Sequence, residues 1–446
     1  MTDTQRNPLA QNFSPLSLIK FALPSMVMML FMGLYTVVDT VFVARFVDTD
    51  ALSSLNIVCP VISIIVGLGT MLATGGSAII AKKMGEGKAD EARGDFTLII
   101  ITGLIIGLVI TGFGILFIDN IVWGLGASEL LFPYCKEYLT VQLIFAVGNI
   151  MQVLYQNLFV TAGKPTLGLI LSVLAGIANI VFDYVFIVMF HLGISGAALG
   201  TGIGYMIPTI IGTLFFMTEK SELHFSRPKS SISVLLKSCS NGTSEMVGQL
   251  STAVTTFLFN VIMMDLSGED GVAAITVIIY SQFLLTTLYI GFSMGTAPVI
   301  SYNYGNGNVE QLKKVVRICY GFVVAISAVV FLFSFWGGES ISKIFAERNE
   351  NVFEIAKTGF TVFSFGFLFS GVNIFTSAMF TALSNGKLSA TISFLRTFVL
   401  ITLSLLILPK FLKVMGVWLA IPITELLTLL VAICLIFRYR KRYNYL

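Results

Sequence analysis

The chain is a succession of apolar stretches, each long enough to cross a lipid bilayer as a helix. A crossing helix needs about 20 mostly apolar residues. Only 11% of the residues are charged, against about 25% in a soluble domain. The sequence therefore predicts an all-α integral membrane protein, with no room for a soluble catalytic or nucleic-acid-binding domain. We count twelve transmembrane helices, near residues 16–46, 51–81, 96–118, 131–161, 166–190, 194–217, 234–264, 271–303, 315–337, 352–383, 388–409 and 416–437.

The basic residues divide unevenly between the two sets of loops that twelve spans create. One set and the C-terminal tail carry most of them: Lys82, Lys83, Lys88, Arg93, Lys164, Lys220, Arg227, Lys229, Lys313, Lys314, Arg317, Lys387, Arg438, Arg440, Lys441 and Arg442. The opposite loops and helix ends hold fewer: Arg45, Lys136, Lys343, Arg348, Lys357, Lys410 and Lys413. Cytoplasmic loops carry the excess of Lys and Arg. We therefore expect a multi-pass protein of the cell (inner) membrane with both termini cytoplasmic.

The two halves of the chain repeat one another. The loop KKMGEGKADEA, with Gly85 and Gly87, returns about 220 residues later as YNYGNGNVEQL, with Gly305 and Gly307. Six spans per half give both halves the same orientation, related by an axis along the membrane normal. We expect two six-helix lobes around a central cleft, 1–220 and 221–446, joined by a cytoplasmic linker near 218–232. This is the plan of a transporter.

Ionisable residues within the spans are candidates for function, because a charge in hydrocarbon is costly. The spans hold Asp39, Asp183, Glu245, Arg396 and Glu425. Counted along their helices, Asp39, Asp183 and Thr201 lie about 11 to 12 Å below the same membrane surface. Asn179 shares a helix face with Asp183. Two carboxylates, an amide and a hydroxyl at one depth suit a proton or a hard monovalent cation; the alternative is structural bonding between helices.

The remaining candidates are assigned from depth alone. Glu245 and Arg396 lie at similar depths near the cytoplasmic side, which favours a structural ion pair over a direct transport role. Glu425, beside Pro422, suits substrate contact and structural bonding equally. Polar residues that are candidates for lining the cleft, although each is more typical of helix contacts, include Gln156, Gln249, Tyr280 and Gln282.

Several runs resemble the multidrug and toxic compound extrusion (MATE) family over essentially the whole chain. They are PSMVMMLFMGLYTVVDTVFVARF with Pro24 and Asp39, MGEGKADEA, NIVFD at 179–183, and GAALGT at 196–201. The resemblance implies export of amphipathic, often cationic organic compounds in exchange for Na⁺ or H⁺. It assigns ion coupling to Asp39, Asn179, Asp183 and Thr201, which would ligate the metal if the ion is Na⁺, and a helix bend to Pro24.

Two positions depart from the pattern of that family. Tyr184 stands where many relatives have Pro after the aspartate, so the local helix geometry is expected to differ. Gly200 replaces a common Ala, a change expected to be minor.

Three other functions are weaker alternatives. Lipid-linked oligosaccharide flippases of the same superfamily commonly have extra spans and cationic residues in the cleft to hold phosphate, whereas the intramembrane charges here are mainly acidic. An intramembrane enzyme or an ATP-driven pump lacks its motifs, because HExxH and Walker sequences are absent. We expect no cofactor beyond the coupling ion. As partners we expect small-molecule drugs or toxic organic cations and the lipid bilayer but no nucleic acid, and we expect a monomer.

Overall fold

The apolar stretches fold as long helices in the computed structural model, which describes residues 7–47, 49–218, 221–228, 231–346 and 349–446. Lys220, Lys229 and Arg348 lie outside these residues. The described part of the chain contains no strand. The first half forms η1 (Pro8–Ala10), α1 (Pro15–Phe46), α2 (Thr49–Gly85), α3 (Ala89–Leu116), α4 (Ile118–Gly124), α5 (Phe132–Ile144), α6 (Ala146–Thr161), α7 (Pro165–Asp183), the π-helical turn η2 (Tyr184–Met189) and α8 (Gly193–Phe216).

The second half begins with one very long helix. It forms α9 (Ile232–Gly305), α10 (Val309–Ala346), α11 (Glu350–Phe363), η3 (Ser364–Gly366), α12 (Phe367–Ala382), α13 (Gly386–Phe394), the π-helical turn η4 (Leu395–Leu400), α14 (Ile401–Leu412) and α15 (Val414–Tyr443). Within the described residues, ten segments are long and apolar enough to cross a membrane, and the bent pair α5 and α6 supplies one more.

The helix α9 supplies two spans, because its backbone leaves the helical region at Gly268 (φ 62°, ψ −151°). Glycine has no Cβ and adopts this positive φ without strain. Ser238 and Tyr302, on opposite sides of Gly268, pack against Gly75 and Gly85 near one end of α2. The two halves of α9 therefore run back along each other, and the described residues hold the twelve spans that the sequence predicts.

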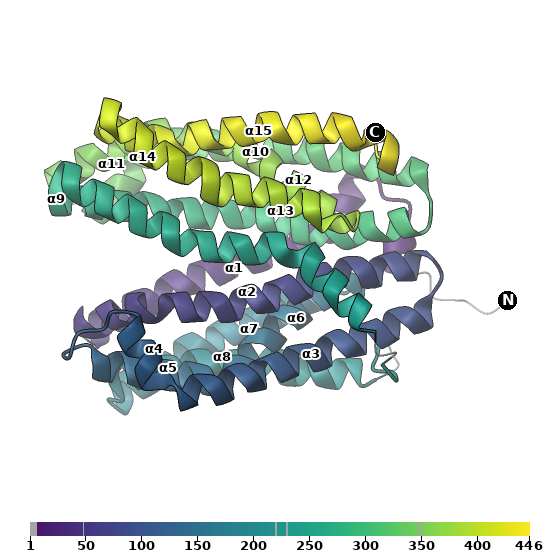
Figure 1. Ribbon diagram of the computed structural model, residues 1–446, viewed down its shortest axis with the longest axis horizontal. Coiled ribbons are helices and arrows are strands. Elements are labelled where there is room, and N and C mark those ends of the chain that lie inside the picture. The colour runs from purple at the N-terminus through teal and green to yellow at the C-terminus, as the bar shows by residue number, and fades with distance from the viewer. Residues whose placement is uncertain (1–6, 48, 219–220, 229–230, 347–348) are drawn as a thin grey trace.

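The helices form two lobes, each with its own apolar core (Figure 1). We call α1–α8 the N-lobe and α9–α15 the C-lobe. The N-lobe is filled by one cluster of buried apolar residues, whose members run along the sequence from Val43 to Leu223. Two further clusters lie mainly in the C-lobe, one around Phe375 and one around Trp418. The Phe375 cluster also includes Ala22 of α1 and Ala81 of α2.

The lobes touch at the end of the molecule where α1 begins and the C-terminus lies, which we call the terminal end (Figure 1). Gly85 packs directly on the carbonyl of Tyr302, and Gly305 packs on the carbonyl of Lys82. A side chain at either glycine would collide with the opposing backbone. The Lys82 ammonium also lies 5.1 Å from the centroid of the Tyr304 ring, a favourable cation–π distance.

The sequence repeat reappears as a repeat of backbone geometry. Gly87 and Gly307 end the matching loops after α2 and α9, with φ of 74° and 67°. Both follow a helix terminus, where a left-handed residue closes the last turn. The two loops are therefore structural copies as well as sequence copies.

Candidate functional site

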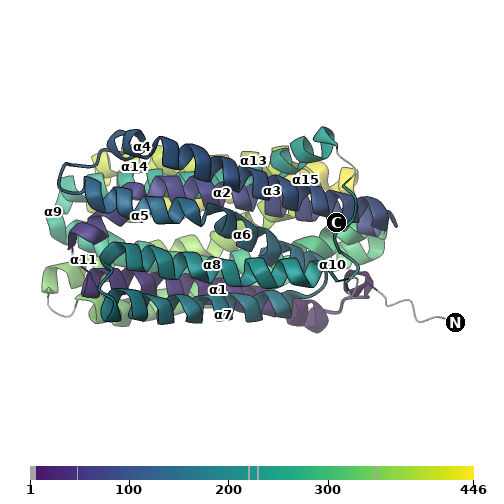
Figure 2. The same ribbon diagram turned by 90° about the horizontal axis from the view of Figure 1, so that it is seen from below.

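Three helices of the N-lobe bring the predicted polar residues together. Asp39 lies on α1, Asn179 and Asp183 lie on α7, and Thr201 lies on α8. These helices run side by side in Figure 2 and pack against one another. Asn179, Asp183 and Thr201 are almost fully buried, with exposed fractions of 2%, 0% and 9%. We call these four residues the acid cluster.

The amide of Asn179 holds the cluster together. Its Nδ2 donates to Asp183 Oδ1 over 3.4 Å and to Thr201 Oγ1 over 3.3 Å. The carboxyl groups of Asp39 and Asp183 lie within hydrogen-bonding reach of each other. Two ionised carboxylates only accept hydrogen bonds, so the two groups attract each other only when a proton or a cation lies between them.

Three acceptor oxygens of the cluster are buried without a donor among the described residues. They are Asp39 Oδ1, Asn179 Oδ1 and Asp183 Oδ2. A buried acceptor without a partner costs free energy, so each of these oxygens favours a positively charged guest. Carboxylate, amide and hydroxyl oxygens are the donor set that hard cations prefer. The residues present therefore fit either Na⁺ or a proton.

The helix α8 approaches this cluster closely because of a glycine. A Cβ at Gly200 would collide with Asp183 Oδ1. The carboxylate therefore lies directly against the α8 backbone, and the Gly200 position matters more than its sequence context indicates. Tyr184, the other departure from the family pattern, begins the π-helical turn η2 and points outward with 51% exposure.

Three tyrosines that the sequence did not lead us to predict lie close to the acid cluster. Tyr35, Tyr138 and Tyr205 lie near enough to Asp39 for its charge to act on their hydroxyl groups. Gln142 Nε2 donates to the Tyr138 hydroxyl over 3.2 Å. One signal was present in the sequence: Tyr35 precedes Asp39 by four residues and Tyr205 follows Thr201 by four, a spacing that places side chains on one helix face.

The predicted ion pair of the C-lobe is corrected by the structure. Arg396 pairs with Glu425 and not with Glu245: its Nε donates to both carboxylate oxygens over 2.8 and 3.0 Å, and its Nη2 lies 2.7 Å from Oε1. Asn373 Nδ2 donates to Glu425 Oε2 over 2.7 Å. Glu425 accepts hydrogen bonds from Arg396 and Asn373 at once, which explains why Arg396 pairs with it. Glu245 senses the charge of Arg396 only at longer range.

The other predicted cleft residues divide into two groups. Gln156 is 4% exposed and donates to Ser172 Oγ over 3.0 Å, so it joins helices, and Glu425 is 3% exposed. Gln249 is exposed and packs beside Gly67 of α2, while Tyr280 is 41% exposed near Cys59 of α2. Gln282 is half-buried on α9. Gln249 and Tyr280 thus lie where the lobes face each other.

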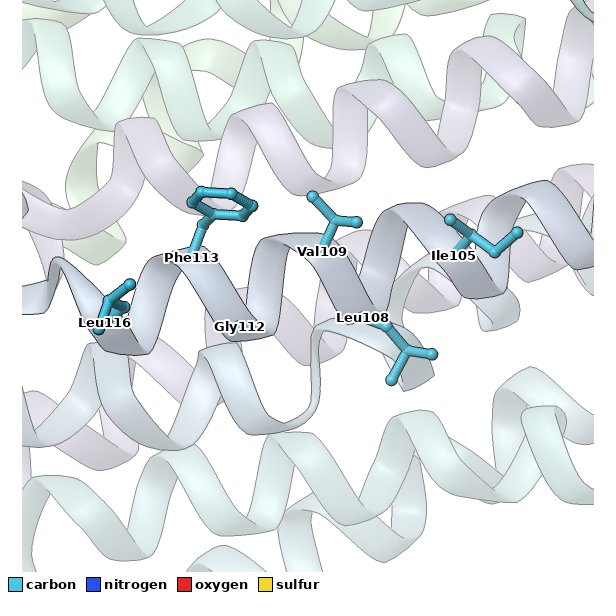
Figure 3. A pocket seen from close by; sticks show the side chains of 6 residues that line it. All are labelled: Ile105, Leu108, Val109, Gly112, Phe113 and Leu116. Carbon is cyan, nitrogen blue, oxygen red and sulfur yellow. The ribbon is translucent and has the colours of Figure 1, made fainter.

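An apolar groove of about 370 Å³ lies away from the acid cluster, along α3. It is lined by Ile105, Leu108, Val109, Gly112, Phe113 and Leu116 (Figure 3). Leu116 and Phe113 are 73% and 62% exposed. Large exposed apolar side chains on a membrane-spanning helix are typical of a lipid-facing surface, so this groove faces hydrocarbon.

Comparisons with known proteins agree with this architecture. The MatE family model matches residues 24–185 and 246–406. The chain is 22% identical over 435 residues to the multidrug export protein MepA of Staphylococcus saprophyticus, covering 95% of this chain and 94% of that protein. MepA of Staphylococcus haemolyticus is 23% identical over 445 residues, covering 96% and 94%.

Solved structures share the fold over the full length. A MATE protein crystallised in complex with MaL6 superposes with a TM-score of 0.93 at 21% identity, covering 99% of this chain and 100% of that chain. An outward-facing multidrug resistance MATE transporter gives a TM-score of 0.93 at 22% identity, covering 100% of both chains. Since the family model covers both lobes, the chain belongs to the multidrug and toxic compound extrusion (MATE) family.

Proposed function

We propose that this protein is a secondary active multidrug efflux transporter. It exports amphipathic, often cationic organic compounds in antiport with Na⁺ or H⁺ by alternating access. The observation that carries this proposal is the acid cluster, in which two facing carboxyl groups and three donor-free buried oxygens lie inside a membrane-spanning lobe. The names of the MepA relatives support drugs as the substrates.

The coupling step follows from where the cluster residues reside. Asp39 belongs to α1, whereas Asp183 and Thr201 belong to α7 and α8. When both carboxylates are ionised they repel each other, and α1 is pushed from its neighbours. A proton or Na⁺ removes this repulsion. Ion binding then draws the three helices together and expels the drug from the N-lobe.

The remaining assignments belong to the same proposal. By the positive-inside rule, the terminal end lies on the cytoplasmic side of a cell (inner) membrane. The lobes divide at residues 220 and 221, and the transporter acts as a monomer. No cofactor takes part except the coupling ion.

The test is ethidium efflux from proteoliposomes, with Na⁺ and proton gradients imposed separately. We expect Asp39→Asn and Asp183→Asn to abolish gradient-driven efflux, because an amide keeps the size but neither exchanges a proton nor balances a cation. Asp119→Asn is the matched control, because Asp119 forms an exposed ion pair with Lys136 over 2.7 Å. Wild-type rates in both cluster variants would contradict the proposal.

The flippase alternative has less support. A lipid-linked phosphate needs a cationic partner in the cleft. Arg396, however, already forms an ion pair with Glu425, which also accepts a hydrogen bond from Asn373. The guanidinium charge is therefore neutralised where a phosphate would need it.

A further inference from the structure

Residues 7–13, which precede α1, are folded against both lobes at the terminal end. We propose that this N-terminal segment, residues 7–13, is a clasp that keeps the lobes together there and must release before the transporter opens at that end. The inference rests on the proposed function only in requiring that the lobes separate at this end during the cycle.

The segment is bound to the C-lobe by its apolar side chains. Leu9 and Phe13 are 0% exposed. They belong to the same buried cluster as Val315 and Val316 of α10, although they precede the first helix of the N-lobe. Gln311 Nε2, at the start of α10, lies 3.5 Å from the carbonyl oxygen of Phe13. This anchor therefore joins the N-terminal segment to the other half of the chain.

The segment also touches the N-lobe. Gly163, with φ of 71°, turns the loop between α6 and α7, and a Cβ there would lie 2.6 Å from Cβ of Pro8. The Asn7 side chain accepts a hydrogen bond from the Leu9 amide over 2.9 Å and fixes the turn η1. The turn η1 therefore contacts both lobes.

The helix that follows continues the same bridge. Ala22 of α1 packs against Gly295 of α9, whose Cβ would lie 2.8 Å from the Ala22 Cα. Further along α1, Phe31 packs on Gly176 of α7 in the N-lobe, while Gly33 still packs beside Leu284 of α9. Asp39 lies two turns beyond Phe31. The clasp and the acid cluster therefore lie towards opposite ends of one helix, which contacts both lobes between them.

The first experiment measures lobe separation directly. Spin labels at Lys88→Cys and Glu310→Cys report the distance between exposed positions of the two lobes at the terminal end, with the five native cysteines replaced. We expect Leu9→Ala and Phe13→Ala to increase the ratio of separated to closed lobes by about tenfold, because truncating a buried side chain removes packing from the closed state alone. Leu16→Ala, at a position that is 64% exposed, is the matched control and leaves the ratio unchanged.

The second experiment locks the clasp. In the cysteine-free protein, a disulfide between Phe13→Cys and Gln311→Cys should stop ethidium efflux, and a reductant should restore it, while oxidant should not change the rate of either single variant. Spin-label distances that are identical in Leu9→Ala, Phe13→Ala and Leu16→Ala, or full transport by the cross-linked protein, would overturn the clasp. The distances do not require transport, so they separate a failed clasp from a failed antiport proposal.

Discussion

At the residue scale, Gly200 sets how closely Asp183 approaches α8. Gly200→Ala places a methyl group where Asp183 Oδ1 lies, so the carboxylate must move away from Asn179 and Thr201. A penalty of about 1 kcal/mol on the ion-bound state corresponds to roughly fivefold in affinity. We therefore expect the ion concentration for half-maximal efflux to rise by about fivefold or more.

Gly112→Ala is the control for this substitution. Gly112 is also a helical glycine, but a Cβ there meets no atom within 4 Å. Alanine has the higher helix propensity, so this variant should keep the ion dependence of the parent. Equal ion dependence in Gly200→Ala would show that the Asp183 carboxylate adapts without cost.

The Arg396–Glu425 pair gives a second residue-scale prediction. Arg396→Gln and Glu425→Gln should each lower stability by about 3 kcal/mol or more, because each strands a buried charge, and the double variant should recover part of the loss. The measurement is a double-mutant cycle on thermal unfolding in detergent. The same cycle with Glu245→Gln and Arg396→Gln serves as the comparison and should give the smaller coupling, since no hydrogen bond joins those residues in the described structure. A larger coupling to Glu245 would reverse the assignment.

At the element scale, the linker between the lobes is docked over part of its length. Leu223 is fully buried, and the rings of Phe225 and Phe96 lie 5.3 Å apart. Arg93 Nε donates to the Glu222 carbonyl over 2.9 Å, and the Ser226 amide donates to Thr97 Oγ1 over 3.0 Å. Residues 221–228 are thus attached to α3 of the N-lobe, which shortens the free tether.

Burial raises the pKa of the Glu222 carboxyl group, and the charge of Arg93 partly opposes the shift. The pKa of Glu222 is therefore higher in the docked linker than in a free linker. Docking is strongest below the ordinary glutamate pKa of about 4.3, and it weakens as the pH rises through the pKa of Glu222 in the docked state. We expect hydrogen-exchange protection of the Ser226 amide, corrected for intrinsic rates, to fall with rising pH, and Glu222→Gln to remove that fall. The same pH dependence in the variant would exclude Glu222 as its source.

The element scale also shows what the sequence can predict. Span lengths and the repeat come from hydropathy and glycine spacing, and these gave all twelve crossings, including the turn of α9 that Gly268 makes possible. The short helix α4, the π-helical turns and the docked linker depend on packing between helices, which hydropathy does not record. Depth along a helix correctly grouped the acid cluster. It failed for Glu245 because depth does not specify which neighbouring helix a side chain faces.

At the scale of the whole molecule, the proposed antiport requires that drug and ion bias one equilibrium between two arrangements of the lobes. The acid cluster lies towards the C-terminal end of α1 and the clasp precedes its N-terminal end, so in the proposed cycle this helix connects ion binding with lobe separation. In an export cycle each ligand then weakens the binding of the other, and linkage makes this effect reciprocal.

Coupling of about 1 to 3 kcal/mol would change the apparent drug affinity by about 5- to 150-fold. The measurement is ethidium binding in detergent across a Na⁺ titration at fixed pH and a pH titration at fixed Na⁺. Asp183→Asn should bind ethidium with an affinity that neither titration alters, because an amide carries no charge for the ion to neutralise. Whichever titration weakens binding to the parent protein identifies the coupling ion. An affinity unchanged in both titrations would contradict antiport, because a ligand that does not distinguish the two arrangements shifts no equilibrium.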